Sequence, residues 1–553
     1  MPTERQHGGA ALIPINLTAP ALRGLNTEAE GSLLTPEWAT VLTNCVFDSA
    51  GRASVRKGFI SQTATPGAGV IMRVHEYVKS NGTIETISST DADIFKTASA
   101  PTSIEGSLAI SEGNIKFVNL NDKCIALGTG TSSNPSVYTG AGNFTTVSVA
   151  SGTAPTGRIG TSAFGRLWVT DSDGHTIRYS ALLDETKWDA ADGGGTIDMA
   201  RVWPSGQDVV TGIEEFAGDL VIFGQHNTVI WTDGAGSDIG INPLNIYISD
   251  TIPGIGCVSQ FAIARAKGDL WFLSYAGMQS LNRAMQDKTT PTNNVSKNVQ
   301  SATLAHLANE SDKDNITLEY SPTEDFVLCV FPQNNKVLCF DTRGMMEDGS
   351  FRATQWDSSV QTVKYFQNDQ QLYGSLTGTV GEIMKYIGFN DDGTSYDFAY
   401  QSGWLEFGEV NQYLKFVKRL TSFMFIAQDT NVVFNLFYDF NSNAKATTVT
   451  VSGESTAAEF GDSPANGAVA GLTEGSEFTS DYTTDPGRTG IGYIVPLAST
   501  VESDFGGGVS LQTLSIPGKG GGQYIKVGCS LSTADGDFAL QQINLYAKVG
   551  RIA

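Results

Sequence analysis

A hairpin pattern that recurs seven times is the feature of this sequence that most constrains its fold. Each copy has a turn, an apolar strand, a second turn and a second strand, as in Phe164-Gly165-Arg166-Leu167-Trp168-Val169 followed by Thr176-Ile177-Arg178-Tyr179. The first turn lies at Asn81 and the last at Asp369, so the copies follow one another at a mean interval of 48 residues. Intervals of about 40–50 residues are typical of β-propeller blades.

A propeller follows from how such a hairpin can bury its surface. One blade has two apolar faces and cannot cover them alone, whereas blades stacked around an axis cover both faces and close into a ring. Asn-Gly positions such as Asn81-Gly82 supply the positive φ angles that tight hairpin turns need. We therefore predict an all-β fold with a six- or seven-bladed β-propeller over residues 69–398. An open β-sandwich of meandering hairpins is the alternative.

The two flanks lack the repeat, and we expect them to form an additional β-sandwich-like platform. Residues 1–68 would be its N-terminal segment, residues 399–450 its middle strands and residues 521–553 its last strands. Residues 451–520 are acidic and rich in glycine, which favours a mobile loop or an excursion that is ordered only in an assembly. We expect this insertion to project from the assembly as a tip or gate that narrows or lines an exit.

Charge and cysteine content exclude several classes of protein. A formal net charge of −23 argues against tight wrapping around nucleic acid, but it is compatible with a channel through which DNA slides. The six cysteines form no CxxC pair, so we expect reduced, buried side chains and no zinc or redox site. No apolar stretch approaches the length of a membrane span, and the first residues lack a signal-peptide pattern. We expect assembly in a cytoplasm.

No residue pattern in the sequence points to catalysis, a cofactor or a metal. HExxH, GxxxxGK(S/T) and GxSxG are absent. Asp171-Ser172-Asp173-Gly174 begins like a calcium loop, but Leu182 stands where an EF-hand needs Glu, so an Asp-Gly hairpin turn is the better interpretation. Asp391-Asp392-Gly393 is interpreted in the same way. We therefore predict no catalytic, cofactor-binding or metal residues. The five histidines, which are not spaced as metal ligands, are His7, His75, His175, His226 and His306.

Several short segments near the N-terminus together resemble one known family. They are Gly24-Leu25-Asn26, Pro36-Glu37-Trp38-Ala39, Asn44-Cys45 and Arg56-Lys57-Gly58-Phe59, and the hairpin at 164–169 with its sequel at 179–184 adds to them. In this order they resemble the tail nozzle proteins of short-tailed bacteriophages (podoviruses), which close the tail tube and stabilise the packaged DNA. The resemblance covers about residues 15–440.

The resemblance implies a structural virion protein and not an enzyme. Such proteins form a hexameric ring at the tail tip, dock on an adaptor ring and lie close to tail fibres or spikes. They retain the packaged DNA and let it pass on infection, so the implied contact with genomic DNA is transient. The implied location is the virion, after assembly in the host cytoplasm. A glycan-binding or glycan-cleaving β-propeller, with two carboxylates near its axis, is the alternative function.

Overall fold

The computed structural model divides the chain into two compact units, Met1–Gly58 with Ile387–Ala553 and Phe59–Tyr386. It describes residues 12–62, 69–97, 101–130, 133–204, 206–233, 243–288, 294–378, 381–406, 414–426, 430–451, 510–533 and 536–549. Most of the predicted insertion, residues 452–509, lies outside the described residues, and so does its expected role as a tip or gate.

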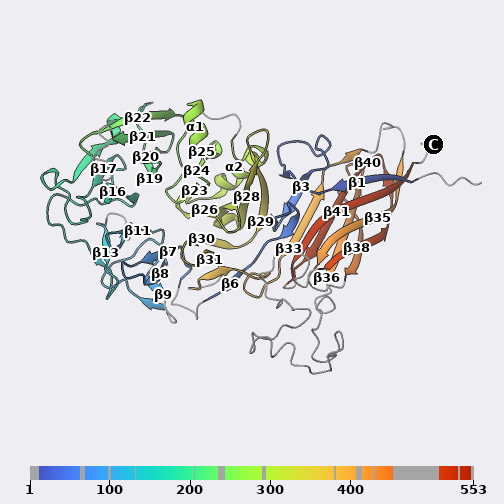
Figure 1. The fold of residues 1–553 in the computed structure, drawn as a ribbon, viewed down its shortest axis with the longest axis horizontal. Helices are drawn as coiled ribbons and strands as arrows, with labels where there is room; N and C mark the ends of the chain where they lie inside the picture. Colours follow the sequence, from blue (N-terminus) through green and yellow to red (C-terminus); the bar gives the residue numbers. More distant parts are fainter. Residues whose placement is uncertain are drawn as a thin grey trace, which may run out of the picture. The chain divides into compact units, whose positions relative to one another are not determined.

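The unit Phe59–Tyr386 is a β-propeller, which confirms the predicted fold class. Its strands form antiparallel meanders whose inner strands follow one another around an axis in chain order, and Figure 1 looks along this axis. Blade 1 contains β7 (Arg73–Val78), β8 (Ile84–Ser89), β9 (Ile94–Thr97) and β10 (Pro101–Ser103); blade 2 contains β11 (Lys116–Leu120), β12 (Lys123–Leu127), β13 (Ser136–Tyr138) and β14 (Thr145–Thr146); blade 3 contains β15 (Gly160–Ala163), β16 (Arg166–Thr170), β17 (Thr176–Tyr179) and β18 (Gly195–Asp198).

The second half of the ring follows the same order, with one short blade. Blade 5 has only three strands among the described residues, and two α-helices follow it. Blade 4 contains β19 (Val210–Phe216), β20 (Asp219–Gly224), β21 (Asn227–Asp233) and β22 (Ile246–Pro253); blade 5 contains β23 (Ile263–Ala266), β24 (Asp269–Ser274) and β25 (Gly277–Ser280), followed by α1 (Leu281–Asp287) and α2 (Gln300–Asn309); blade 6 contains β26 (Thr317–Ser321), β27 (Phe326–Phe331), β28 (Lys336–Met345) and β29 (Phe351–Asp357).

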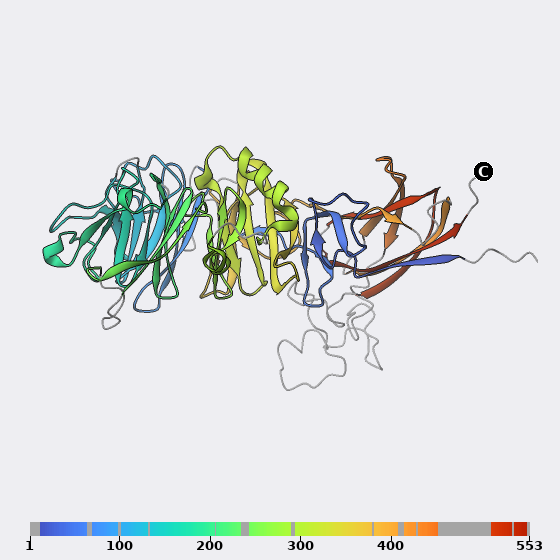
Figure 2. The ribbon, with the colours of Figure 1, turned by 90° about the horizontal axis from the view of Figure 1, so that it is seen from above.

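The last blade joins both ends of the propeller. It contains β30 (Val360–Phe366), β31 (Gln371–Leu376), β32 (Met384–Tyr386) and β6 (Phe59–Ser61), which pairs antiparallel with β32. Six blades are separate sheets, and β26–β29 supply a seventh meander whose inner strand contacts β23 and β30. The contact between β30 and β7 then closes the ring. Figure 2 shows the blade strands running mostly up and down in the view turned by 90°.

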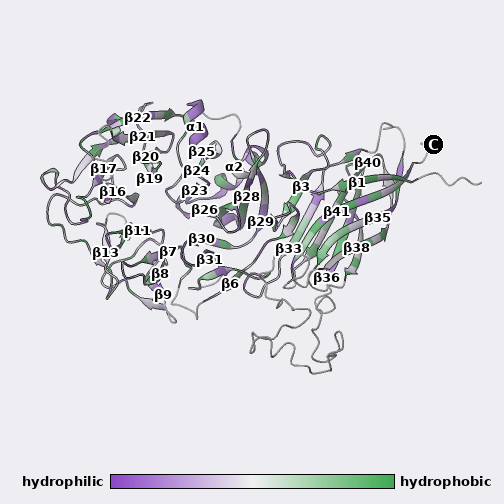
Figure 3. Ribbon diagram, viewed as in Figure 1, coloured by the Kyte–Doolittle hydropathy of each residue, from purple (hydrophilic) through white to green (hydrophobic). Residues whose placement is uncertain are grey.

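Apolar side chains between neighbouring blades form the propeller core, as the burial argument requires. One cluster joins blades 3 and 4 around Trp168, which is fully buried and donates from Nε1 to the carbonyl oxygen of Ala163 at 3.1 Å. Another joins blades 1 and 2 around Tyr77 and Tyr138, whose rings lie 5.8 Å apart. Each fully buried large apolar side chain contributes about 1.5–3 kcal/mol. In Figure 3 green hydrophobic segments alternate with white and purple ones along the strands, while α1 is purple.

The recurring turns have the backbone geometry that their glycines permit. At Ala217-Gly218, between β19 and β20, both residues have positive φ angles, 54° and 90°. The same pair of positive angles occurs at Lys267-Gly268, 47° and 78°. Two central residues with positive φ define the type I′ hairpin turn, whose twist matches that of the flanking strands.

The unit formed by the two flanks contains two sheets. In one, the strand order is β38-β35-β41-β5-β4, with β1 on β41 and β39 on β35; in the other it is β3-β33-β40-β36-β37, with β2 on β3 and β34 on β40. Phe398 and Phe538, one from each sheet, pack edge to face at 5.1 Å. The strands are β1 (Ile13–Thr18), β2 (Gly24–Leu25), β3 (Trp38–Thr43), β4 (Cys45–Phe47), β5 (Ala53–Val55), β33 (Asp397–Ser402), β34 (Leu405–Glu406), β35 (Lys415–Ile426), β36 (Thr430–Tyr438), β37 (Lys445–Val451), β38 (Ser510–Pro517), β39 (Gly521–Gly522), β40 (Tyr524–Ser532) and β41 (Phe538–Val549).

The chain leaves this unit for the propeller and returns to it at adjacent points. Gly58 donates its backbone N–H to the carbonyl oxygen of Gly388, and Ile387 donates to that of Gly58, both at 3.0 Å. The propeller is therefore inserted into the other unit. β6 falls within the predicted N-terminal segment 1–68, but it completes blade 7. No helix among the described residues is long and apolar enough to cross a membrane.

Candidate functional site

The inner strands of the propeller enclose a cavity on its axis. A space of about 660 Å³ is lined by residues of β7, β11, β19, β23, β26 and β30, and a smaller space of about 180 Å³ adjoins it. A concave, partly polar space enclosed by several elements is the default candidate for a binding site. The residues that line both spaces are His75, Lys116, Ile263, Glu319 and Lys364.

Charged side chains of opposite sign alternate around the larger space. Lys116 Nζ lies 3.2 Å from Glu214 Oε1, and Arg265 Nη2 lies 3.6 Å from Glu214 Oε2. Lys364 Nζ lies 3.1 Å from Glu319 Oε2. Each pair joins different blades, because β11, β19, β23, β26 and β30 each supply one member. The wall therefore offers matched donors and acceptors and carries little net charge.

His75 is the one histidine that the propeller places in this cavity. Its Nε2 lies 2.9 Å from Asn119 Oδ1, and its ring stacks on Phe117 at 5.8 Å. Desolvation by burial lowers the pKa of His75 to about 4, and the positive charges of Lys364 and Lys116 act in the same direction. His75 is therefore neutral at physiological pH.

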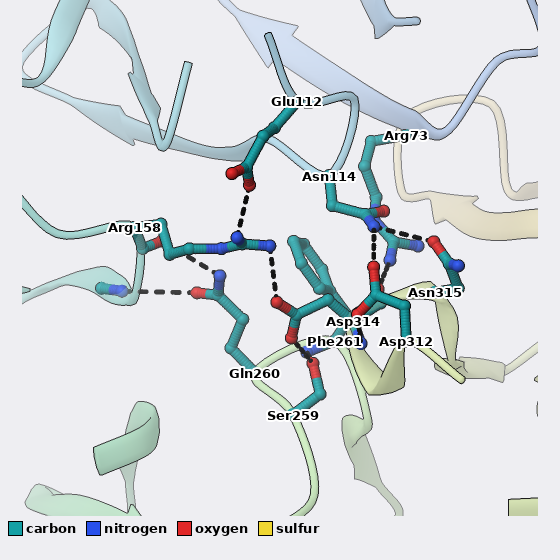
Figure 4. A network of polar contacts seen from close by, with 11 residues as sticks. Arg73, Glu112, Asn114, Arg158, Ser259, Gln260, Phe261, Asp312, Asp314 and Asn315 are labelled. Atoms are coloured by element: carbon teal, nitrogen blue, oxygen red, sulfur yellow. Dashed lines mark hydrogen bonds and ion pairs between the residues drawn. The ribbon is translucent and has the colours of Figure 1, made fainter. Parts of the chain in front are cut away.

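Arg73 of β7 lines the smaller space and belongs to the polar network drawn in Figure 4. Its Nη1 donates to Thr317 Oγ1 at 2.6 Å and to Thr362 Oγ1 at 3.2 Å, and its Nη2 donates to the carbonyl oxygen of Asp314. The guanidinium carbon lies 3.8 Å from the centroid of the Phe261 ring. Burial lowers the pKa of Arg73 to about 9, so the side chain stays charged at neutral pH.

A second arginine, Arg158, continues this network to the opposite side of the ring. It pairs with Glu112 and donates from Nη2 to Asp314 Oδ2 at 2.6 Å. Ser259 Oγ donates to Asp314 Oδ1 at 2.7 Å, and Gln260 Nε2 donates to the carbonyl oxygen of Arg158 at 3.0 Å. Arg158 precedes β15 of blade 3, and Asp314 lies in the 3-10 turn Lys313–Asn315 before β26 of blade 6. Because these blades are not neighbours, the pair between Arg158 and Asp314, drawn in Figure 4, bridges the ring.

The aspartates singled out in the sequence form turns. Asp171-Ser172-Asp173-Gly174 joins β16 and β17, and Gly174 donates its N–H to the carbonyl oxygen of Asp171 at 3.0 Å. The carboxylate of Asp173 accepts the backbone N–H groups of the next turn, and that of Asp171 accepts from Arg178 at 2.6 Å. The hairpin interpretation is confirmed. Among the described residues, no group of three or more His, Cys, Asp or Glu side chains could hold a metal ion.

The structure does not gather the remaining histidines or the cysteines into a site. His226 lies beside Tyr275 at 6.0 Å, and His306 lies in α2 with its Nε2 3.4 Å from Gln355 Oε1. His175 sits next to the turn after β16, and His7 lies outside the described residues. All six cysteines are buried and free of disulfides, and burial raises the pKa of Cys257 to about 12.

The axial residues were missed by the motif search because they lie in ordinary blade strands and form no motif along the sequence. One signal could have found them. In blades 2, 4, 5, 6 and 7, a charged residue stands two to six residues before the first hairpin turn of the copy. Those residues are Lys116, Glu214, Arg265, Glu319 and Lys364.

Comparisons with known proteins identify no family, since no family model and no curated sequence matches the chain. Among solved structures, a streptogramin B lyase matches with a TM-score of 0.37 and 11% identity, over 59% of this chain and 97% of that chain. The WD40 domain of Pan2 from Neurospora crassa matches with a TM-score of 0.35 and 9% identity, over 60% and 95% of the two chains. An auxiliary nutrient binding protein from Bacteroides thetaiotaomicron matches with a TM-score of 0.32 and 10% identity, over 60% and 75%. These likenesses are too low to carry a functional argument.

Proposed function

We propose that the chain is a structural virion protein, the tail nozzle of a short-tailed bacteriophage. In this role it closes the tail channel, retains the packaged DNA and lets it pass on infection. The observation that carries the proposal is the way the N-terminal segments that resemble this family enter one fold unit. These segments run from Gly24 to Phe59, and all of their residues except Phe59, the first residue of the propeller unit, lie in the flanking unit.

Residues of these segments make specific contacts in the flanking unit. Gly24-Leu25 pairs in parallel with Trp38-Ala39. Arg56 Nε donates to Asn44 Oδ1 at 3.3 Å. Gly58 lies where the chain leaves for the propeller, and a Cβ atom there would come 1.7 Å from the carbonyl oxygen of Asn390. Asn44, Arg56 and Gly58 therefore each have a structural role in the flanking unit, which is compatible with the resemblance.

The geometry of the axis bears on the path that DNA would take. The pair between Arg158 and Asp314 bridges the axis, and the charges around the larger space are paired. We infer that DNA does not run through the propeller and that its channel is the axis of a ring of subunits. A channel wall in a chain with a net charge of −23 repels DNA and lets it slide.

The same proposal includes the partners and the location. The chain would form a homo-hexameric ring at the virion tail tip, dock on the tail adaptor ring, and lie beside fibres or spikes. Contact with genomic DNA would be transient. The proposed role is not enzymatic.

A glycan-cleaving propeller is the alternative function, and the axial residues can be compared with those that such an enzyme needs. Such an enzyme needs two carboxylates about 5–10 Å apart, of which one is protonated when it acts as an acid. Glu214 and Glu319 line the axial space, but each lies within an ion pair with lysine. Glu76, the third carboxylate of the lining, accepts the backbone N–H groups of Gln367 and Asn368, so each of the three already has a partner within the chain.

Electron microscopy of the purified chain and of particles that contain it tests the proposal. We expect six-fold rings, and antibody against the propeller should label the tail tip of short-tailed particles. Particles assembled without the chain should lose their DNA, while particles lacking a fibre protein, as a control, should retain it. Monomers that never join particles would refute the proposal, and reducing-sugar release by the purified chain would favour the glycan-cleaving alternative.

A further inference from the structure

Four neighbouring strands of the flanking unit contain no acidic residue. β1, β35, β38 and β41 lie side by side in one sheet (Figure 1), and together they carry Lys415, Lys418, Arg419 and Lys548. In the whole chain, about one residue in ten is Asp or Glu. Asp537 directly precedes β41 and therefore lies at the opposite end of that strand from Lys548. This part of the sheet is basic, although the chain has a net charge of −23.

Strand pairing places three of these cations on one face of the sheet, together with two aromatic rings. Phe416 of β35 is directly opposite Lys548 of antiparallel β41, and Arg419 is directly opposite Tyr546. Residues that are directly opposite in such a pair point to the same side. Lys418 is the extra residue of a bulge in β35, and its Nζ lies 5.8 Å from the centroid of the Phe416 ring. We call these five residues the basic face.

The three cations of the basic face have no acidic partner in the part of the chain that the structure describes. The side chains of Lys418, Arg419 and Lys548 are exposed and form no ion pair or hydrogen bond there. Most lysines and arginines of the propeller unit, in contrast, lie in ion pairs, as Lys336 does with Asp357. The basic face is therefore a local excess of positive charge that attracts anions from solution.

The chemistry of the basic face matches phosphate groups and nucleobases. The Arg419 guanidinium carbon lies 4.3 Å from the centroid of the Tyr546 ring, and a guanidinium stacked in this way keeps the N–H groups at its edge for the two oxygens of a phosphate. Phe416 is 41% exposed and neighbours both lysines. Cations combined with exposed aromatic rings are typical of surfaces that bind nucleic acid, because every base has a face that can stack.

We propose that the basic face binds the phosphate backbone of nucleic acid. Lys418, Arg419 and Lys548 contact phosphates, and Phe416 stacks on a base where the nucleic acid is single-stranded. An acidic protein fits less well, because its carboxylates would use the cations but not the exposed ring. Three cations are too few for tight wrapping, so we expect a dissociation constant in the range of about 10⁻⁴–10⁻⁶ M that is typical of non-specific contacts. Such contacts leave the nucleic acid free to move.

This inference deepens the proposed nozzle function, and the identification of the bound nucleic acid as packaged DNA rests on that function. The binding itself is a property of one subunit, because the five residues belong to two neighbouring strands of one sheet. It can therefore be measured without a ring and without virus particles.

Fluorescence anisotropy of labelled DNA of about 20 nucleotides, single-stranded or duplex, tests the basic face when the full chain is titrated at pH 7 and several salt concentrations. We expect the triple variant Lys418→Met, Arg419→Met and Lys548→Met to bind at least tenfold more weakly at low salt. Each single substitution should reduce the slope of log K against log salt by about 0.7–0.9, because one phosphate contact is lost. Lys445→Met is the matched control, because Lys445 is also an exposed lysine of the flanking unit but lies in β37 of the other sheet. It should leave the affinity within twofold.

Phe416→Ala separates the two forms of DNA. It should weaken binding of the single strand severalfold and leave binding of the duplex within twofold, because only unpaired bases can stack on the ring. Equal affinity for the single strand before and after this substitution would refute the role of Phe416.

Other outcomes would overturn the proposal. These are absence of binding to both DNAs at low salt, or a triple variant that binds as tightly as Lys445→Met. Equal or tighter binding of polyglutamate would assign the basic face to an acidic protein, and equal or tighter binding of phosphatidylglycerol vesicles would assign it to a lipid surface. A chain that forms rings at the tail tip but binds no DNA would refute this inference alone, whereas a chain that binds DNA but never joins particles would refute the nozzle function alone.

Discussion

Replacing Arg56 by methionine tests why the Arg-Lys-Gly-Phe segment has its sequence. Arg56 is fully buried, donates from Nη1 and Nη2 to the carboxylate of Asp391 at 2.9 and 2.6 Å, and lies over the Tyr396 ring at 3.8 Å. Asp391 is 13% exposed, so water reaches it poorly. Breaking a buried pair by removing one partner costs about 3–5 kcal/mol. We expect Arg56→Met to lower the free energy of unfolding of the flanking unit by that amount.

Urea unfolding followed by circular dichroism and tryptophan fluorescence measures the effect. The transition of the flanking unit should move to lower urea, while that of the propeller should not. Arg23→Met is the matched control, because the Arg23 pair with Glu37 has a similar distance of 2.8 Å but both side chains are nearly half exposed. It should cost no more than about 1 kcal/mol.

A second substitution separates the charge from the packing. Asp391→Asn added to Arg56→Met removes the buried charge, so it should restore a large part of the lost stability. If Arg56→Met costs no more than Arg23→Met, or if Asp391→Asn destabilises the double variant further, the buried-pair reasoning is wrong.

Three further substitutions test other parts of the fold. Gly58→Ala should lower the free energy of unfolding in urea by at least about 3 kcal/mol, because its Cβ would lie 1.7 Å from the carbonyl oxygen of Asn390. In the control Gly82→Ala the new Cβ meets nothing within 4 Å, so only the positive φ should cost stability, about 1–2 kcal/mol. Equal losses in the two variants would contradict this reasoning. The pKa of His75 is lowered from 6.5 to about 4, so between these pH values the folded state binds fewer protons than the unfolded state. The contribution of His75 to the free energy of unfolding is therefore fully present above pH 6.5, and at most about 3 kcal/mol of it is lost towards pH 4. Thermal melts of His75→Gln should lack this part of the decline, and an unchanged pH profile would refute it. Asp314→Asn should lower the free energy of unfolding of the propeller by about 1–3 kcal/mol, because it weakens the bridge across the axis, and a melting temperature equal to that of the unsubstituted chain would rule out this role.

The propeller could be predicted from sequence because its signal is repeated. Turns such as Ala217-Gly218 need residues that tolerate positive φ, and the strands beside them must be apolar to fill the space between blades. Neither requirement depends on distant residues. The repeat can therefore be recognised in the sequence even where single copies, such as the three-stranded blade 5, depart from it.

The features that depend on distant residues were not predictable in the same way. β6 has only three residues, so it carries no period, and its place in blade 7 depends on pairing with β32 across more than three hundred positions of sequence. The axial network also depends on residues that are distant in the sequence. Arg73, Arg158 and Asp314 lie far apart in the sequence and share no motif, and only closure of the ring brings them together. Helices α1 and α2 were not expected either, since the repeat does not contain them.

The insertion of the propeller through adjacent strands has a consequence for how such a chain can be rebuilt. Because Gly58 and Ile387 are already hydrogen-bonded, a short turn could join them in place of residues 59–386 without separating any strand of the remaining unit. Loop closure over such a short distance costs little entropy. A different domain whose two ends lie equally close together could be joined at the same two positions.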